Sequence, residues 1–211
     1  MVIAVVGAGG KTTLLKKLAA QYRKEKKTVF VTTTTHMFIE EETLLTDDAD
    51  PILHRLKEDG YVMAGIPEGD KIKALSPKTY EEVCSVADVV LVEADGSKHL
   101  PLKYPAAFEP VIPENIDEIL VVCGLNAIGQ QAKKACHRLE LVKECLGIGD
   151  ETIITAEHVQ KLMTDGYLKP LRAAFPSVTI KLIPRHDGSP YQRAIATLLE
   201  NGQDVSVIQE A

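Results

Sequence analysis

Short apolar segments alternate with segments of helical character along most of this 211-residue chain. The continuous apolar runs at 2–6 and 88–93 are typical of buried parallel strands, and β-branched residues favour a strand over 28–34. Strands are predicted over seven segments: 2–6, 28–34, 61–66, 88–93, 118–123, 178–183 and 204–208. Helices are predicted over five segments: 12–27, 78–87, 137–147, 155–174 and 190–200. The alternation predicts a three-layer α/β fold, with a mostly parallel sheet flanked by helices.

Two segments interrupt this pattern. The acid-rich segment 40–59 is interpreted as a helix or loop exposed to solvent, and across 124–155 glycine and charge replace the strand signals. The length fits one large α/β domain or two small ones. We therefore predict a single domain over 1–211, with a helical insertion or lobe around 124–175.

The composition is that of a globular protein with a mild excess of acid. Lys and Arg number 24 against 30 Asp and Glu, a net charge of −6, which argues against dedicated nucleic-acid binding. No apolar run approaches the ~18 residues of a membrane span, and no cationic region precedes the first run. We expect a cytoplasmic protein with no membrane contact. The four cysteines lack zinc-site spacing and are interpreted as free thiols.

The net charge conceals an uneven distribution. Residues 11–27 hold seven Lys or Arg and one Glu, a local charge of +6, whereas residues 40–59 hold eight acids and two bases, a local charge of −6. A basic helix next to the first strand suits a small anionic ligand.

A glycine-rich loop joins the first predicted strand to the first predicted helix, which is where a P-loop occurs. Its backbone amides and the helix N-terminus favour phosphate oxygens. The residues predicted to bind a nucleotide here are Gly7, Ala8, Gly9, Gly10, Lys11, Thr12 and Thr13. Lys11 would reach the β- and γ-phosphates, and the Thr12 hydroxyl would bind Mg²⁺. The spacing is more compact than G-x-x-x-x-G-K-[ST], so a ligand-free turn and a dinucleotide site remain alternatives.

A second motif, DVVLVEADG at 88–96, has the form of an apolar strand that ends in acids. This is the Walker B arrangement, in which a carboxylate holds Mg²⁺ directly or through water. We predict Glu93 and Asp95 as metal ligands beside Thr12, and as catalytic residues beside Lys11. Gly96 is placed to contact the γ-phosphate. Thr32, Thr33 and His36 lie at the end of the second predicted strand, 28–34, at the same sheet edge, and His36 is a candidate general base, with an ordinary loop histidine as the alternative.

The proline-rich loop 97–113 and three later residues supply further candidates. Lys98 and Lys103 are predicted to bind phosphate or a second anionic ligand, and a plain surface loop is the alternative. Arg138 and Arg185 are each interpreted as a candidate arginine finger. Cys136 lies beside His137 and Arg138, where a lowered thiol pKa would favour selenium or sulfur transfer.

Three segments together resemble the family of selenium-dependent hydroxylase accessory proteins: VVGAGGKTT at 5–13, VTTTTHM at 31–37 and LVEADGSKHLPLKYPAAFEPVIP at 91–113. The resemblance implies a cytoplasmic bacterial protein with a P-loop NTPase-like fold that acts in maturation of selenium-dependent molybdenum hydroxylases. It indicates a pathway and no reaction. Glu93 to Gly96, with the segment 102–108, is also similar to nickel-insertion GTPases, which suggests a metallochaperone-like role.

These observations leave several functions open. The first is a Mg²⁺-dependent NTPase or switch that uses ATP or GTP; no N-K-x-D motif is present, which favours an adenine nucleotide or broad specificity. The others are a non-hydrolysing nucleotide- or molybdopterin-binding chaperone, a carrier that uses Cys136, and a kinase for a small anion. The expected partners are a nucleotide and a molybdenum hydroxylase or its cofactor, and the chain is a candidate homodimer.

Overall fold

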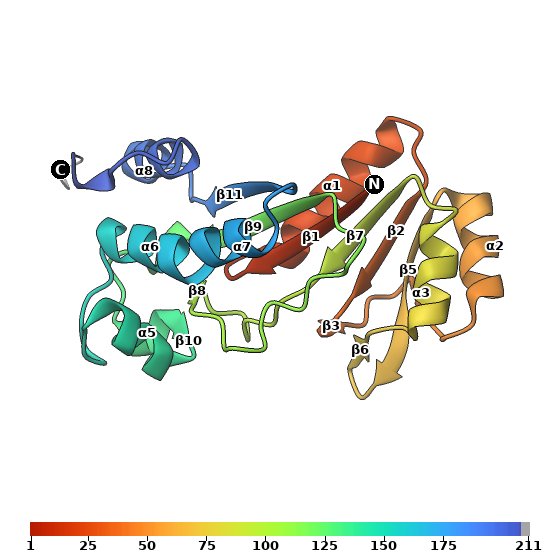
Figure 1. Ribbon diagram of the computed structural model, residues 1–211, viewed down its shortest axis with the longest axis horizontal. Coiled ribbons are helices and arrows are strands. Elements are labelled where there is room, and N and C mark those ends of the chain that lie inside the picture. Colours follow the sequence, from red (N-terminus) through yellow and green to blue (C-terminus); the bar gives the residue numbers. More distant parts are fainter. Residues whose placement is uncertain (208–211) are drawn as a thin grey trace. The chain divides into compact units, whose positions relative to one another are not determined.

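The computed structural model describes residues 1–207 of the chain. Contacts between residues divide it into two compact units. Unit 1 comprises Met1–Val5, Thr12–Gly96 and Val111–Glu118, and unit 2 comprises Val6–Lys11, Ser97–Pro110 and Ile119–Ala211. Each unit is described by itself below, with the element labels of Figure 1.

Unit 1 contains a mostly parallel sheet. β1 (Val2–Gly7, of which Val2–Val5 belong here), β7 (Val89–Glu93), β2 (Val29–Thr33) and β5 (Tyr61–Glu68) follow one another as parallel neighbours. β4 (Thr43–Leu45) joins β5 in parallel, and β6 (Lys71–Lys73) and β3 (His36–Phe38) extend the sheet in antiparallel fashion. Every residue of β2 and β7 is buried, because parallel sheets are covered on both faces.

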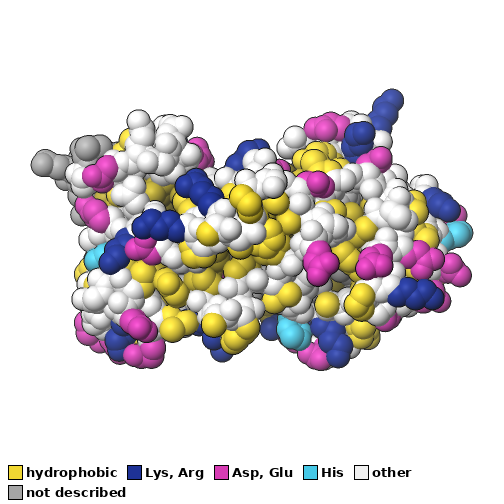
Figure 2. Space-filling model, in the orientation of Figure 1, with side chains coloured by type: hydrophobic (Ala, Val, Ile, Leu, Met, Phe, Trp, Pro, Cys, Tyr) yellow, Lys and Arg dark blue, Asp and Glu magenta, His cyan; other side chains and the backbone are white. Residues whose placement is uncertain are grey.

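Three helices accompany these strands: α1 (Lys11–Lys24), α2 (Ala49–Asp59) and α3 (Pro77–Cys84). Asp48 accepts a hydrogen bond from the Asp50 amide at the start of α2, and Gly60 ends that helix in the left-handed region. Ser76 caps α3 by accepting from the Thr79 amide. Acidic side chains are visible over the part of unit 1 that holds α2 and α3, as the composition of 40–59 predicts (Figure 2).

Unit 2 contains β9 (Glu118–Gly124, from Ile119 onward) beside β11 (Thr179–Arg185), and a parallel pair of short strands, β8 (Leu102–Lys103) and β10 (Cys136–His137). Its helices and helical turns are η1 (Leu125–Ala127), α4 (Ala132–Ala135), α5 (Leu139–Leu146), α6 (Ala156–Met163), the π-helical turn η2 (Thr164–Leu168), α7 (Lys169–Ala174), α8 (Pro190–Glu200) and η3 (Val205–Val207). α6, η2 and α7 run on without a break between them.

The predicted fold class, a mostly parallel sheet flanked by helices, is confirmed. The predicted strand over 204–208 is wrong for the described residues. Asp204 accepts a hydrogen bond from the Ser206 amide, which favours a turn, and Val205–Val207 form a 3₁₀-helix; Ile208 lies outside the described residues. Segment 40–59 contains β4 and α2 in place of one exposed element. The single domain over 1–211 stays a prediction.

Candidate functional site

The glycine-rich loop of unit 2 packs closely against the end of β9. The Ala8 amide donates to the Val122 carbonyl over 2.9 Å. Gly7 has φ +86°, and a Cβ atom at this position would lie 2.2 Å from the same carbonyl oxygen. At Gly9, with φ +80°, a Cβ atom would lie 2.6 Å from the Gly124 nitrogen. Only glycine satisfies both the backbone conformation and the close approach at these two positions.

Lys11 is buried at the base of this loop, with 4% of its surface exposed. Its ammonium group donates to the Gly7 carbonyl over 2.9 Å and to the Ser97 hydroxyl over 3.0 Å. Burial of a lysine charge is costly, so the fold holds that charge at the loop by specific hydrogen bonds. A fixed cation next to a turn of glycine amides is what an anionic phosphate requires.

In unit 1 the hydroxyl of Thr12 donates to a carboxylate oxygen of Glu93 over 3.2 Å. Glu93 ends β7, opposite Val5 of the neighbouring parallel strand β1, and only 7% of it is exposed. The sheet register therefore brings together a hydroxyl and a carboxylate that stand 81 positions apart in the chain. A Ser or Thr hydroxyl and one acid are the protein groups that P-loop NTPases contribute to Mg²⁺.

The backbone around Glu93 is held by the threonines of β2. The Glu93 carbonyl accepts from the Thr33 hydroxyl over 2.7 Å and from the Thr34 amide over 3.1 Å. The Thr32 hydroxyl donates to the Ala64 carbonyl. These threonines therefore support the strand ends in this structure. Asp95 follows Glu93 and is fully buried.

No group of three or more His, Cys, Asp or Glu side chains that could hold a metal occurs in residues 1–207. A structural zinc site uses four ligands of these types. Mg²⁺ needs fewer protein ligands, since it keeps several water ligands and also binds the phosphates of the substrate. The Thr12–Glu93 pair fits that smaller requirement.

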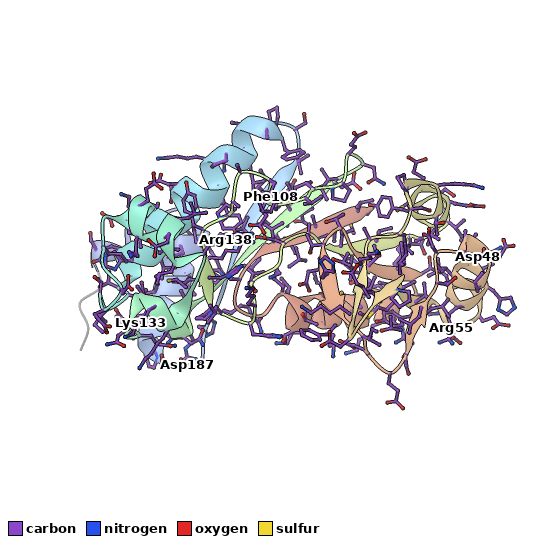
Figure 3. All side chains as sticks on the ribbon, turned by 90° about the horizontal axis from the view of Figure 1, so that it is seen from below. Asp48, Arg55, Phe108, Lys133, Arg138 and Asp187 are labelled. Atoms are coloured by element: carbon purple, nitrogen blue, oxygen red, sulfur yellow. The ribbon has the colours of Figure 1, made fainter. Side chains whose placement is uncertain are left out.

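A second polar cluster lies in unit 2, where β8 and β10 pair. Glu109 accepts two hydrogen bonds from Arg138, each over 2.8 Å, and one from the Lys103 ammonium over 2.8 Å. The Ala106 amide donates to the same carboxylate. Burial raises the pKa of Glu109, but the hydrogen bonds from Arg138 and Lys103 outweigh it and lower this pKa to about 2. Arg138 also lies over the ring of Phe108, which Figure 3 labels next to it.

This cluster changes the interpretation of two predicted residues. Lys103 is completely buried, and its charge is paired with Glu109. Its predicted contact with a phosphate stays untested and would require the pair to open. Lys98 is exposed and adopts φ +48°, a strained conformation for a residue other than glycine. The Arg138 guanidinium group donates to Glu109 and lies over the ring of Phe108. These contacts do not support its predicted role as an arginine finger.

The expected low pKa of the Cys136 thiol is wrong. Cys136 is 3% exposed, and burial raises its pKa to about 12, because the apolar surroundings disfavour the thiolate. Its neighbour His137 has a lowered pKa through burial and the charges of Lys103 and Arg138. A selenium or sulfur carrier that depends on a reactive Cys136 thiolate therefore lacks its chemical basis.

Two remaining candidates lie in different settings. His36 pairs with Glu68 on the surface of unit 1, over 2.7 Å, and this contact gives it no link to the Thr12–Glu93 pair. Arg185, in unit 2, lies close to the glycine loop, since a Cβ atom at Gly10 would lie 3.6 Å from its side chain. Arg185 is thus the better placed of the two arginine candidates.

Sequence reasoning missed the roles of Ser97 and Glu109. Ser97 directly follows Gly96 and accepts from Lys11, and its place next to the acidic motif was the available signal. Glu109 pairs with a residue 29 positions away, and no motif marks that pairing.

The model of one protein family, described as YqeC protein, matches residues 3–140, which is more than half of the chain. The chain belongs to the YqeC protein family. The matched region includes the glycine loop, β7 and the Glu109 cluster, whereas Arg185 lies outside it.

Two individual proteins are similar to this YqeC family member. The chain is 32% identical over 81 residues to the uncharacterized protein YqeC of Escherichia coli (strain K12), a match that covers 37% of this chain and 32% of that protein. The chain thus spans about a third of the length of this relative. A solved structure, the MinC:MinD cell division protein complex of Aquifex aeolicus, is 16% identical, covers 98% of this chain and 88% of its own, and has a TM-score of 0.37. No helix in the described residues is long and apolar enough to cross a membrane.

Proposed function

We propose that this YqeC family member binds a nucleoside triphosphate with Mg²⁺ and hydrolyses it. The observation that carries the proposal is the hydrogen bond between Thr12 and Glu93, because it pairs the loop hydroxyl with the strand-end acid that Mg²⁺ binding needs. Lys11 precedes Thr12 in the chain, so the buried cation and the hydroxyl are joined through one peptide bond.

Each residue has a definite part in this proposal. The loop amides of Gly7, Gly9 and Gly10 and those of Thr12 and Thr13 bind phosphate oxygens, and Lys11 neutralises the β- and γ-phosphates. The Ala8 amide, also predicted from the sequence to bind phosphate, donates instead to the Val122 carbonyl. Thr12 and Glu93 bind Mg²⁺, and Asp95 orients its water ligands or the attacking water. Gly96 offers its amide to the γ-phosphate, and Lys98 offers an exposed charge. The nucleotide is ATP or GTP, with the missing N-K-x-D motif in favour of ATP or of broad specificity.

The wider role is part of the same proposal. The resemblance of 5–13, 31–37 and 91–113 to selenium-dependent hydroxylase accessory proteins supports a cytoplasmic function in molybdenum hydroxylase maturation. In this account the chain is one P-loop NTPase-like domain over 1–211 whose partner is a molybdenum hydroxylase or its cofactor. A non-hydrolysing chaperone would bind nucleotide at the same residues without turnover, so phosphate release separates the two functions.

Lys11→Ala tests the binding step. We expect this variant to lose about 10- to 100-fold in affinity for ATP and GTP, because hydrogen bonds to charged groups are worth about 1.5–3 kcal/mol. Calorimetric titration with ATP, GTP and CTP in the presence of Mg²⁺ measures the affinity. Lys16→Ala is the matched control, since Lys16 lies on the same helix with 60% of its side chain exposed and pairs with Glu40. Equal affinities for both variants and the wild type would refute phosphate binding by Lys11.

A further inference from the structure

β11 ends next to the glycine-rich loop, and its last residue is Arg185. β11 and β9 are neighbours in the sheet order, and Figure 1 shows them side by side. The loop packs on the end of β9, where a Cβ atom at Gly9 would lie 2.6 Å from the Gly124 nitrogen. At Gly10, the next residue of the loop, a Cβ atom would lie 3.6 Å from both Cγ and Nε of Arg185. The Arg185 side chain therefore lies against the loop backbone at Gly10.

The turn that follows Arg185 is held by its own hydrogen bonds. Asp187 accepts from the Ser189 amide over 2.8 Å, and the Asp187 amide donates to the Gln192 side chain over 3.1 Å. Ser189 in turn caps α8 by accepting from the Gln192 amide. A short turn that is tied to the start of a helix fixes the end of β11. Arg185 therefore stands on a rigid part of the backbone, as a binding residue requires.

The Arg185 guanidinium group has no protein partner in the part of the chain that the structure describes. Within residues 1–207 its side chain forms no hydrogen bond and no ion pair, although it is half-buried. Arg138, by contrast, donates to both carboxylate oxygens of Glu109. Arginine carries five N–H donors and stays charged. A charge that is partly removed from water without a protein partner is costly, and a bound anion is the partner that offsets this cost.

The position next to Gly10 indicates which part of a nucleotide Arg185 would contact. In a P-loop the glycine backbone cradles the α- and β-phosphates, and the lysine reaches the β- and γ-phosphates. Gly10 directly precedes Lys11 and belongs to the glycine backbone of this loop. Arginine binds phosphate through two parallel N–H donors. A guanidinium group at Gly10 therefore suits the diphosphate part, which nucleoside diphosphates and triphosphates share.

We propose that Arg185 binds the α- and β-phosphates of the nucleotide from the end of β11 and contributes equally to the affinity for diphosphates and triphosphates. This inference rests on the proposed function and adds to its site a residue from outside the loop. An arginine finger acts differently, since it stabilises charge on the γ-phosphate in the transition state. A contact that is equal in the ground state and the transition state changes KM and leaves kcat alone. Arg185 therefore controls affinity and not turnover.

Calorimetric titration of ATP, ADP, GTP and GDP with Mg²⁺ onto the full chain tests this role, with release of inorganic phosphate measured in parallel. We expect Arg185→Gln to weaken binding of a triphosphate and of its diphosphate by the same factor, about tenfold or more, because both lose one charge-assisted contact. KM for hydrolysis should rise with it, and kcat should stay within about threefold of the wild type. Arg185→Lys keeps the charge without the planar fork and should recover part of the affinity.

The matched control is Arg193→Gln, since Arg193 is an exposed arginine of α8 in the same unit. It should change each affinity less than about twofold. Without nucleotide, Arg185→Gln should be as stable to chemical denaturation as the wild type, because in residues 1–207 its side chain has no hydrogen bond or ion pair to lose. If Arg185→Gln folds poorly, Arg185→Lys replaces it, with a smaller expected loss that is again equal for diphosphate and triphosphate.

Three results would overturn this role while the wild type still binds a triphosphate, so that the proposed function survives. The first is unchanged diphosphate affinity in the Arg185 variants. The second is a fall in kcat of about 10³-fold with affinity intact, which is the result expected of an arginine finger. The third is an equal loss in Arg193→Gln, which would be a general effect of charge. If the wild type binds none of the four nucleotides, the proposed function fails and this inference fails with it.

Discussion

Glu93→Gln is expected to lower nucleotide hydrolysis about 100-fold or more, while the protein still folds and binds nucleotide. Gln keeps the size of the side chain and can still accept a hydrogen bond from Thr12, but it removes the negative charge that, in the proposed function, holds Mg²⁺ next to the phosphates. Electrostatic groups of this kind contribute about 2.7–4 kcal/mol to a transition state. Release of inorganic phosphate from ATP and from GTP measures the effect.

The control for this variant is Glu25→Gln, which makes the same chemical change at an exposed residue that pairs with Gln21 near the end of α1. It should hydrolyse at the wild-type rate. Asp95→Asn is a second arm and should also lose hydrolysis, with nucleotide affinity retained. Unchanged turnover in both Glu93→Gln and Asp95→Asn would contradict the proposed roles of the two acids.

Glu109→Ala is expected to destabilise the chain by about 3–5 kcal/mol. It removes the carboxylate that accepts from Arg138 and Lys103, and it leaves the fully buried Lys103 ammonium without that partner. Chemical denaturation at neutral pH measures the free energy of unfolding. Glu140→Ala, at a side chain 81% exposed in a surface pair with Lys143, is the control and should cost less than about 1 kcal/mol.

The same cluster makes stability depend on pH in a predictable direction. The pKa of Glu109 is about 2 in the folded protein, below its value of about 4.3 in an unfolded chain. The stability that the ionised Glu109 carboxylate contributes to the folded protein is therefore fully present above about pH 4.3, and it is lost as the pH falls towards 2. The wild type should lose stability across this window more steeply than Glu109→Ala. Parallel pH profiles for the two proteins would contradict the assignment.

The double variant Lys103→Met/Glu109→Leu tests whether Glu109→Ala destabilises the chain by leaving the Lys103 charge unpaired. An apolar pair of similar volume removes the buried charge together with its partner, so it should recover much of the stability that Glu109→Ala loses. A double variant as unstable as the single one would show that the Glu109 side chain acts through contacts other than Lys103.

The amino-acid sequence predicts the fold class and the position of the glycine-rich loop, for a local reason. β1, β2 and β7 are short runs of apolar and β-branched residues. Such runs predict strands from the local sequence alone, without knowledge of tertiary contacts. The loop Gly7–Lys11 is likewise a contiguous motif, and the left-handed conformations of Gly7 and Gly9 explain why glycine stands there.

What could not be predicted depends on contacts between distant residues. Glu109, Lys103 and Arg138 meet because β8 pairs with β10, and two-residue strands leave no periodic signal. The lowered pKa expected for Cys136 followed from its basic sequence neighbours, but burial decided the pKa instead.

The central claim is that Thr12 and Glu93 hold Mg²⁺ for a nucleotide bound at the glycine loop. It is tested most directly by calorimetric titration of ATP and GTP onto the wild type and Thr12→Ala, each with Mg²⁺ and with EDTA. The account predicts that Mg²⁺ strengthens wild-type binding about tenfold or more and that Thr12→Ala loses most of this gain. Binding of neither nucleotide, or equal wild-type affinity with Mg²⁺ and with EDTA, would contradict it.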